Sequence, residues 1–317
     1  MATVTQPGQA ASRASRRDRL PMPLAALRPY QWPKNLVVFA ALAFSAGEAW
    51  HLSEPGTWWP LLWRSGVLFG LWCLVASGIY LINDIVDREV DRLHPRKRLR
   101  PIASGALPVR AAWVASAVLI LGGLPVAFLL DLSAGGILTG YVVVNLAYSF
   151  GLKRVAILDI IILCSGVVAR AVAGAAVIGV TISPWLYVCT SFGAFFFATS
   201  KRWAEFRQLG EEAASHRPSL AHYTGEVLNQ LLTISAAAAL LGYALYTIES
   251  ERVPRNGAMA ITLPFVAFAL FRYLLLLNGR RSTDAPDQIV FTDPQILVAV
   301  AGFLATAMTV LLVYQPK

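Results

Sequence analysis

The chain has 317 residues, of which 56% are hydrophobic and only 14% are charged. Soluble domains carry about 25% charged residues, so this composition excludes an ordinary soluble protein and predicts an integral membrane protein. The net charge of +9 is compatible with nucleic acid, anionic lipid or a polyanionic substrate as a partner. The basic residues are spread over many segments and form no single patch, which argues against nucleic acid.

Apolar segments recur along the chain at lengths that suit membrane spans. A spanning helix needs about 20 mostly apolar residues. We therefore predict an all-α polytopic membrane protein with nine transmembrane helices, near residues 35–50, 62–84, 110–130, 134–152, 156–179, 183–200, 228–248, 259–277 and 295–314.

The Lys and Arg residues are distributed unevenly between the connecting loops. Of the 27, 22 fall in the stretch up to Lys34 and in the loops after the second, fourth, sixth and eighth segments. This asymmetry places the N-terminus and those loops in the cytoplasm. Residues 1–27 are polar and Arg-rich without the apolar core of a signal peptide, so we expect a disordered cytoplasmic tail followed by one transmembrane domain over 28–317.

Acidic residues follow the second apolar segment in the stretch NDIVDREVD. If the helix continues past Ile82, then Asn83, Asp84, Asp87 and Asp91 lie on one face, where like charges repel. A bound cation removes this repulsion, and a donor set of oxygens without His or Cys favours Mg²⁺. We predict Asp84 and Asp87 as metal ligands, with Asn83 and Asp91 as further candidates.

A basic stretch, HPRKRLRP, comes next in the chain. Its two prolines predict a loop that brings Lys97 and Arg98 within reach of the acids. A metal site beside guanidinium and ammonium groups is what binding of a diphosphate requires. The alternative is that these are ordinary charges next to the membrane that pair with one another on a solvated face.

Other polar residues lie at or within the apolar segments. Arg170 is deep in the fifth segment, where a charge needs a cavity or a partner. Asp159 is 11 residues earlier, about 16 Å along a helix, which is too far for a direct pair and favours a role for Arg170 in substrate binding. The remaining candidates for substrate binding are Lys34, Tyr148, Lys153, Lys201 and Arg202. For Lys201 and Arg202 the alternative is a simple orientation signal.

The motifs resemble a known family. NDIVDREVD followed by RPIASG resembles the first Asp-rich motif of the UbiA-type intramembrane prenyltransferase superfamily, and YSFGLKR resembles the end of its fourth helix. The resemblance covers nearly the whole chain. It implies a UbiA-like bundle of nine helices, a cytosol-facing polar cavity, Mg²⁺ as cofactor and a catalytic role for Asp84 and Asp87.

One departure from the superfamily pattern concerns the loop after the sixth segment. Most members carry a second Asp-rich motif there, whereas this chain has SKRWAEF, with Lys201, Arg202 and a single acid, Glu205. A loop with more cations and fewer carboxylates than usual suits a donor substrate that carries one phosphate more than a prenyl diphosphate. One branch of the superfamily, from actinobacterial cell-wall synthesis, is similar to this chain also in LRPYQWPKN and ARAVAGA.

The branch resemblance implies a reaction. A 5-phosphoribosyl group would pass from phosphoribosyl pyrophosphate to a polyprenyl phosphate such as decaprenyl phosphate, with release of pyrophosphate. The enzyme would act in the plasma membrane, and its product would feed assembly of arabinogalactan.

Two other functions stay open. An aromatic prenyltransferase of the UbiA type would use a prenyl diphosphate, and the unusual 201–224 loop disfavours it. A transporter or scaffold without enzymatic activity is disfavoured because the polar residues gather at one membrane face, with no broken helix at the midplane. The sequence is compatible with a homo-oligomer.

Overall fold

The computed structural model describes residues 22–93, 97–209, 218–250, 253–254, 256–279 and 286–314. Helices connected by turns make up this part of the chain. In chain order they are α1 (Met22–Ala26), η2 (Pro29–Phe39), α2 (Ala40–Phe44), α3 (Pro55–Val86), α4 (Arg88–Leu93), η3 (Lys97–Leu99), α5 (Val109–Leu130), α6 (Leu132–Phe150), η4 (Leu152–Arg154), α7 (Leu158–Val177), α8 (Pro184–Leu209), η6 (Pro218–His222), α10 (Gly225–Glu249), η7 (Ala258–Thr262), α11 (Leu263–Asn278), α12 (Pro286–Thr292) and α13 (Pro294–Val313).

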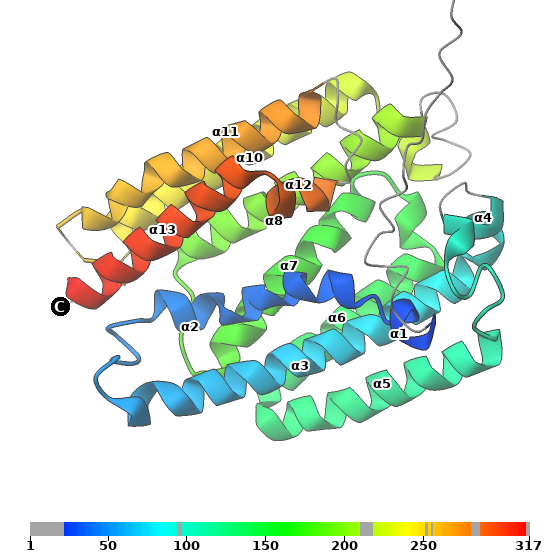
Figure 1. Cartoon of the computed structure of the whole chain (residues 1–317), viewed down its shortest axis with the longest axis horizontal. Coiled ribbons are helices and arrows are strands. Elements are labelled where there is room, and N and C mark those ends of the chain that lie inside the picture. Colours follow the sequence, from blue (N-terminus) through cyan, green and yellow to red (C-terminus); the bar gives the residue numbers. More distant parts are fainter. Residues whose placement is uncertain are drawn as a thin grey trace, which may run out of the picture.

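The long helices run side by side along one direction of the molecule (Figure 1). Helices that follow one another in the chain pack together, with α3 on α5, α6 on α7, α7 on α8, α8 on α10 and α11 on α13. Within the described residues, seven helical segments are long and apolar enough to cross a membrane: α3, α5, α6, α7, α10, the η7–α11 unit and α13. The prediction of an all-α polytopic membrane protein is confirmed.

The first of the nine predicted spans, residues 35–50, is not one continuous α-helix. It consists of the second half of the 3₁₀ helix η2 followed by the five residues of α2. Pro33 lies inside η2 and has no backbone N–H to give to an α-helical hydrogen bond. The sixth predicted span is part of α8, a helix of 26 residues that carries Lys201, Arg202 and Glu205 near its end and is less apolar than the seven.

A glycine lets η2 pack directly on α7. A Cβ atom at Gly174 would overlap with the carbonyl oxygen of Val38, a residue with no exposed surface in the core formed by α3, α6 and α7. We therefore expect Gly174→Ala to push η2 off α7 and to lower the free energy of unfolding by about 3 kcal/mol, the upper part of the range for overpacked cores. Gly140→Ala is the control, because nothing lies within 4 Å of its added methyl group.

Thermal unfolding in detergent measures this difference. Equal melting temperatures for the Gly174 and Gly140 variants would contradict the close packing of η2 on α7.

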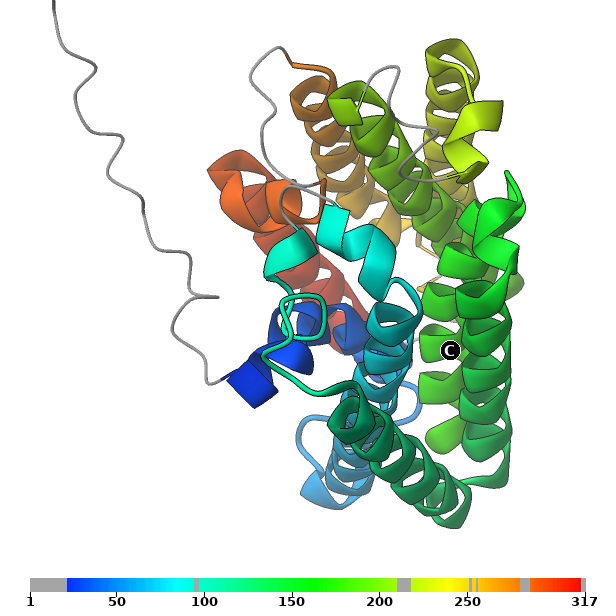
Figure 2. The ribbon, with the colours of Figure 1, turned by 90° about the vertical axis from the view of Figure 1, so that its right-hand side faces the viewer.

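Several short helices gather at one end of the bundle. Helices α4, α1 and the loop around η3 lie at this end, and α2 lies at the other (Figure 1); Figure 2 looks along the bundle onto the first of these ends. We call it the polar end. At the far end Arg64 donates to the carbonyl oxygens of Leu130 (2.9 Å) and Val177 (2.7 Å), which satisfies the last carbonyls of α5 and α7.

The predicted tail meets the described structure at α1. Residues 1–21 lie outside the described residues, whereas Met22–Ala26 form a helical turn and Ala26 is buried beside Leu81, Ile102 and Ala112. The last part of the predicted tail, residues 22–27, is therefore ordered against the bundle, because its apolar side chains find a partner in α3 and α5.

Asp293 begins α13 at the polar end. Its carboxylate accepts from the backbone N–H of Ile296 (3.0 Å) and from the Arg272 guanidinium (3.0 Å). The hydrogen bond from Arg272 is the main cause that holds the pKa of Asp293 below its usual value. A lowered folded-state pKa stabilises the protein above the unfolded pKa of about 3.9, and this stabilisation is lost as the pH falls through the folded pKa.

We expect Asp293→Asn to lower stability by about 1 kcal/mol or less at pH 7, as for a partly exposed ion pair, because Asn still caps the helix. The difference between wild type and variant should shrink as the pH falls below about 4. Melting temperatures of both proteins from pH 3 to pH 8 test this, and a difference that stays constant with pH would refute the ionic contribution.

Candidate active site

Two carboxylates, Asp84 near the end of α3 and Asp91 in α4, share one guanidinium. Asp84 is buried, and its Oδ1 accepts from Arg28 and from Arg100 (3.0 Å). The same Arg100 nitrogen donates to Asp91 Oδ2 (2.6 Å). Burial raises the pKa of Asp91, against the opposing effect of the Arg100 charge. Asp84 and Asp91 thus lie on one face, as predicted, and the structure places cations on that face.

Asp87 points toward a different helix. The α-helix breaks at this residue, yet the backbone hydrogen bonds from Asp87 to Asn83 (2.9 Å) and from Asp91 to Asp87 (2.8 Å) continue the helical path. The Asp87 carboxylate accepts from Lys153 in η4. Asn83 Oδ1 accepts from Ser149 Oγ (3.4 Å) at the end of α6. The predicted single face therefore divides, with Asp87 and Asn83 facing the end of α6.

The basic loop lies next to the acids. Lys97 and Arg98 form part of η3, a short turn between α4 and α5, which agrees with the predicted loop. The positive charge of Lys97 acts on Asp91. The neighbouring Arg96 lies outside the described residues.

A second charged group lies where α7 and α8 meet at the polar end. Asp159 has no exposed surface and accepts from Arg202 Nε (2.6 Å), Ser219 Oγ (3.1 Å) and Tyr223 OH (2.9 Å). Burial raises the pKa of Tyr223 to about 12, so its hydroxyl stays protonated and donates. Tyr223 in turn accepts from the backbone N–H of Ile157 (2.5 Å), which has a positive φ of 65°. This network fixes the start of α7.

Arg202 has protein partners at each end of its guanidinium. Besides Asp159, it donates to Glu205 (2.9 Å) and to the Tyr148 hydroxyl (3.3 Å), and its side chain is 3% exposed. The structure therefore brings together the predicted residues Tyr148 and Arg202. It also makes Arg202 a link between α6, α7 and α8.

Arg170 lies deeper in the bundle and has no contact with Asp159, as predicted. Its Nε donates to Asn35 Oδ1 (2.6 Å), a second nitrogen donates to the Gly166 carbonyl oxygen, and the guanidinium stacks between Trp72 (4.5 Å) and Tyr141 (5.0 Å). Lys34, next to Asn35, donates to Gln31. The Arg170 side chain thus holds η2 against α7 and α3.

Sequence reasoning missed two arginines of this site. Arg28 and Arg100 both bind Asp84, and Arg28 also stacks on the Tyr80 ring at 5.2 Å. Arg28 has a left-handed backbone (φ 54°) where η2 begins, and such a conformation is uncommon outside glycine. Both arginines precede prolines in LRPYQWPKN and RPIASG, so the motifs contained them without indicating their partner.

The carboxylates fit a hard cation held by few protein ligands. In the described part of the chain, no group of three or more His, Cys, Asp and Glu side chains gathers. Mg²⁺ typically takes one or two carboxylates and completes its shell with water and substrate phosphate. Asp84 and Asp87 are one helical turn apart and provide only oxygen donors. The residues present therefore fit Mg²⁺ bound together with a phosphorylated substrate.

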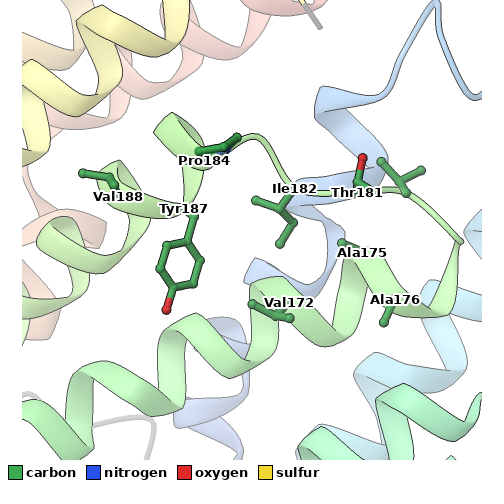
Figure 3. A pocket seen from close by; sticks show the side chains of 9 residues that line it. Val172, Ala175, Ala176, Thr181, Ile182, Pro184, Tyr187 and Val188 are labelled. Carbon is green, nitrogen blue, oxygen red and sulfur yellow. The ribbon is translucent and has the colours of Figure 1, made fainter. Parts of the chain in front are cut away.

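An apolar cavity is remote from these charges. It has a volume of about 550 Å³ and lies between the end of α7 and the start of α8, at the end opposite to the acids (Figure 3). Its lining is almost entirely apolar: Val172, Ala175, Ala176, Val180, Thr181, Ile182, Pro184, Tyr187 and Val188. This cavity does not suit polar substrates, whereas the charged side chains of the polar end do.

The model of the UbiA prenyltransferase family matches residues 35–292, and the chain belongs to this family. It is 34% identical over 295 residues to the decaprenyl-phosphate phosphoribosyltransferase of Mycolicibacterium smegmatis, covering 89% of this chain and 90% of that one. The protein of the same name from Corynebacterium glutamicum is 32% identical over 292 residues, covering 90% and 86%.

Solved structures confirm the fold. The structure of a UbiA homologue from Archaeoglobus fulgidus bound to DMAPP and Mg²⁺ superposes with a TM-score of 0.69. The match covers 92% of this chain and 99% of that one, at 19% sequence identity.

Proposed function

We propose that the protein transfers 5-phosphoribosyl from phosphoribosyl pyrophosphate to decaprenyl phosphate and releases pyrophosphate. The similarity to phosphoribosyltransferases over about nine-tenths of their length supports this. The structural observation that carries it is the α7–α8 junction, where Arg202 neutralises the buried Asp159. With this carboxylate engaged, the junction attracts phosphate through Lys201 and is unsuited to a second metal.

The donor diphosphate is bound at the first acidic motif. Asp84 and Asp87 would hold Mg²⁺, with Asn83 and Asp91 as further candidate ligands, and a bound ion there would supply positive charge to the departing pyrophosphate. Lys153 donates to Asp87 and Arg100 donates to Asp84, so both cations lie beside the proposed metal ligands and could contact diphosphate oxygens. A UbiA homologue of the same fold was solved with Mg²⁺ bound, which supports a divalent ion as the cofactor.

The other basic residues bind the remaining phosphates. Lys97 and Arg98 lie beside the acids and Lys201 beside the α7–α8 junction, which suits the donor 5-phosphate and the acceptor phosphate. Lys34 and Tyr148 complete the proposed substrate contacts. Arg170 and Arg202, predicted as substrate ligands, are so fully engaged by protein groups that we assign them the role of positioning η2 and α8.

The transfer needs no general base, because a phosphate monoester is already anionic at neutral pH. The ribosyl transition state should carry positive charge, as in glycoside hydrolysis. Attack from the face opposite the leaving pyrophosphate gives inversion at the anomeric carbon.

The proposed placement follows from the charge distribution. Residues 28–317 form one catalytic domain in the plasma membrane, with nine spans when η2–α2 and α8 are counted. The polar end faces the cytosol, because the Lys- and Arg-rich loops gather there.

The first experiment incubates purified protein in detergent with Mg²⁺, radiolabelled phosphoribosyl pyrophosphate and decaprenyl phosphate. We expect label in the organic phase, and loss of that label with EDTA. Turnover of a prenyl diphosphate with an aromatic acid, without labelled lipid, would instead establish an aromatic prenyltransferase. Absence of both reactions would favour a transporter or scaffold.

A further inference from the structure

We infer that an apolar pocket between α8 and the α11–α13 pair binds the first isoprene units of the lipid acceptor, with the acceptor phosphate beside Lys201. This inference rests on the proposed function and adds to it the binding site of the lipid chain. Neither the sequence motifs nor the acidic site indicates where that chain lies.

The pocket is narrow and lined by aromatic rings. Its volume is about 240 Å³, and its lining residues are Phe196, Phe197, Phe265, Val266, Ala269, Leu270, Tyr273, Val290, Ile296, Ala299, Val300 and Phe303. The Tyr273 ring packs against Phe196 and Phe197 with centroids 5.4 and 5.3 Å away. Apart from the Tyr273 hydroxyl, the side chains that line this pocket carry no polar group, so its occupant must be apolar.

One end of the pocket adjoins the charged site. The Tyr273 hydroxyl is hydrogen-bonded to buried Ser200 Oγ (2.8 Å), the residue directly before Lys201. Phe197 and Lys201 are four residues apart in α8 and so lie on one face, about 6 Å apart along the axis. An anionic group bound by Lys201 is therefore one helical turn from the aromatic rings.

A polyprenyl phosphate has this combination of groups, with a phosphate joined directly to a chain of alkene units. The pocket is too small for a long polyprenyl chain. Phe197 is 43% exposed and Val300 36% exposed on helices that face lipid, so the rest of the chain can leave the pocket into the bilayer. Aromatic rings of defined orientation suit the planar alkene groups of the first units.

The larger cavity of Figure 3 is a poorer site for these units. Tyr187 in its lining precedes Lys201 by 14 residues of α8, which is about 21 Å along the helix. A chain whose phosphate is held by Lys201 could reach that cavity only with its distant end.

Two matched small-to-large substitutions distinguish the sites. Ala269→Phe fills the aromatic pocket, and Ala176→Phe fills the larger cavity. We expect Ala269→Phe to raise the KM for decaprenyl phosphate at least tenfold and to leave the KM for phosphoribosyl pyrophosphate within twofold. Ala176→Phe should change neither value. An unchanged KM for the lipid in folded Ala269→Phe would overturn the inference.

A second measurement does not depend on activity or on the folding of a variant. Wild-type protein is irradiated with a farnesyl phosphate that carries a diazirine on its last isoprene unit, and the labelled peptides are identified by mass spectrometry. We expect labels on α8, α11 and α13, with competition by decaprenyl phosphate. Labels confined to the end of α7 and the first turns of α8, which line the larger cavity, would overturn the inference. Labels in the pocket without any phosphoribosyl transfer would uphold it and refute the proposed donor.

Discussion

Asp87→Asn is expected to reduce phosphoribosyl transfer at least a hundredfold while leaving the fold intact. The change removes one negative charge from the proposed metal site and keeps the size of the side chain. The Asp87 side chain is 27% exposed and pairs with Lys153, which is 18% exposed, so Lys153 keeps some contact with solvent when the pair is lost and the fold should persist. Initial rates at saturating substrates, together with the melting temperature, measure the two effects separately.

The matched control is Glu89→Gln in the same acidic segment. Glu89 is 72% exposed, and its partners Arg88 and Arg92 are on the surface, so we expect a rate within twofold of wild type. Raising Mg²⁺ should partly restore Asp87→Asn, because weaker metal binding is overcome by mass action. Full activity of Asp87→Asn would show that Asp87 is not a metal ligand. Its ion pair with Lys153 would then be a structural contact only.

Arg202→Met is expected to destabilise the protein by about 3–5 kcal/mol, the range for a buried charge that loses its partner. Asp159 has no exposed surface, and the substitution removes the guanidinium that neutralises it while the neutral donors Ser219 and Tyr223 remain. Thermal unfolding in detergent and the yield of monodisperse protein report the loss. Arg207→Met on the same helix, at an exposed position that donates only to the Leu277 carbonyl oxygen (3.0 Å), should cost about 1 kcal/mol or less.

The double variant Asp159→Asn/Arg202→Met tests whether Arg202 only positions the helices or also contacts the substrate. We expect it to recover most of the lost stability, because both buried charges are removed. Tyr223 can still donate to the amide oxygen, and the amide nitrogen can donate to the Ser219 hydroxyl. Transfer activity within tenfold of wild type would support the positioning role of Arg202. A stable but inactive double variant would indicate that Arg202 binds the substrate, as the sequence alone suggested.

Residue spacing predicted the helical path of the acidic motif, but not the division of its single predicted face between two sets of partners. Asn83, Asp84, Asp87 and Asp91 follow a helix at intervals of a turn, and such a pattern is local, so it can be read without knowing the neighbours. The 11-residue separation of Asp159 and Arg170 likewise excluded a direct pair, because a helix has a fixed rise per residue. By contrast, the partners Arg28 and Arg100 come from loops whose paths no local pattern determines.

The chain's own sequence determined the membrane location, the helical class and the charged end, because these depend on segment length, hydrophobicity and charge order. Only the tertiary structure decided that residues 35–50 are mostly 3₁₀ helix and short α-helix. It also decided that Arg202 forms an ion pair with Asp159 and that Arg170 donates a hydrogen bond to Asn35. Those outcomes depend on contacts between residues far apart in the chain, such as Gly174 with Val38. Packing and burial select among the partners that the sequence leaves open.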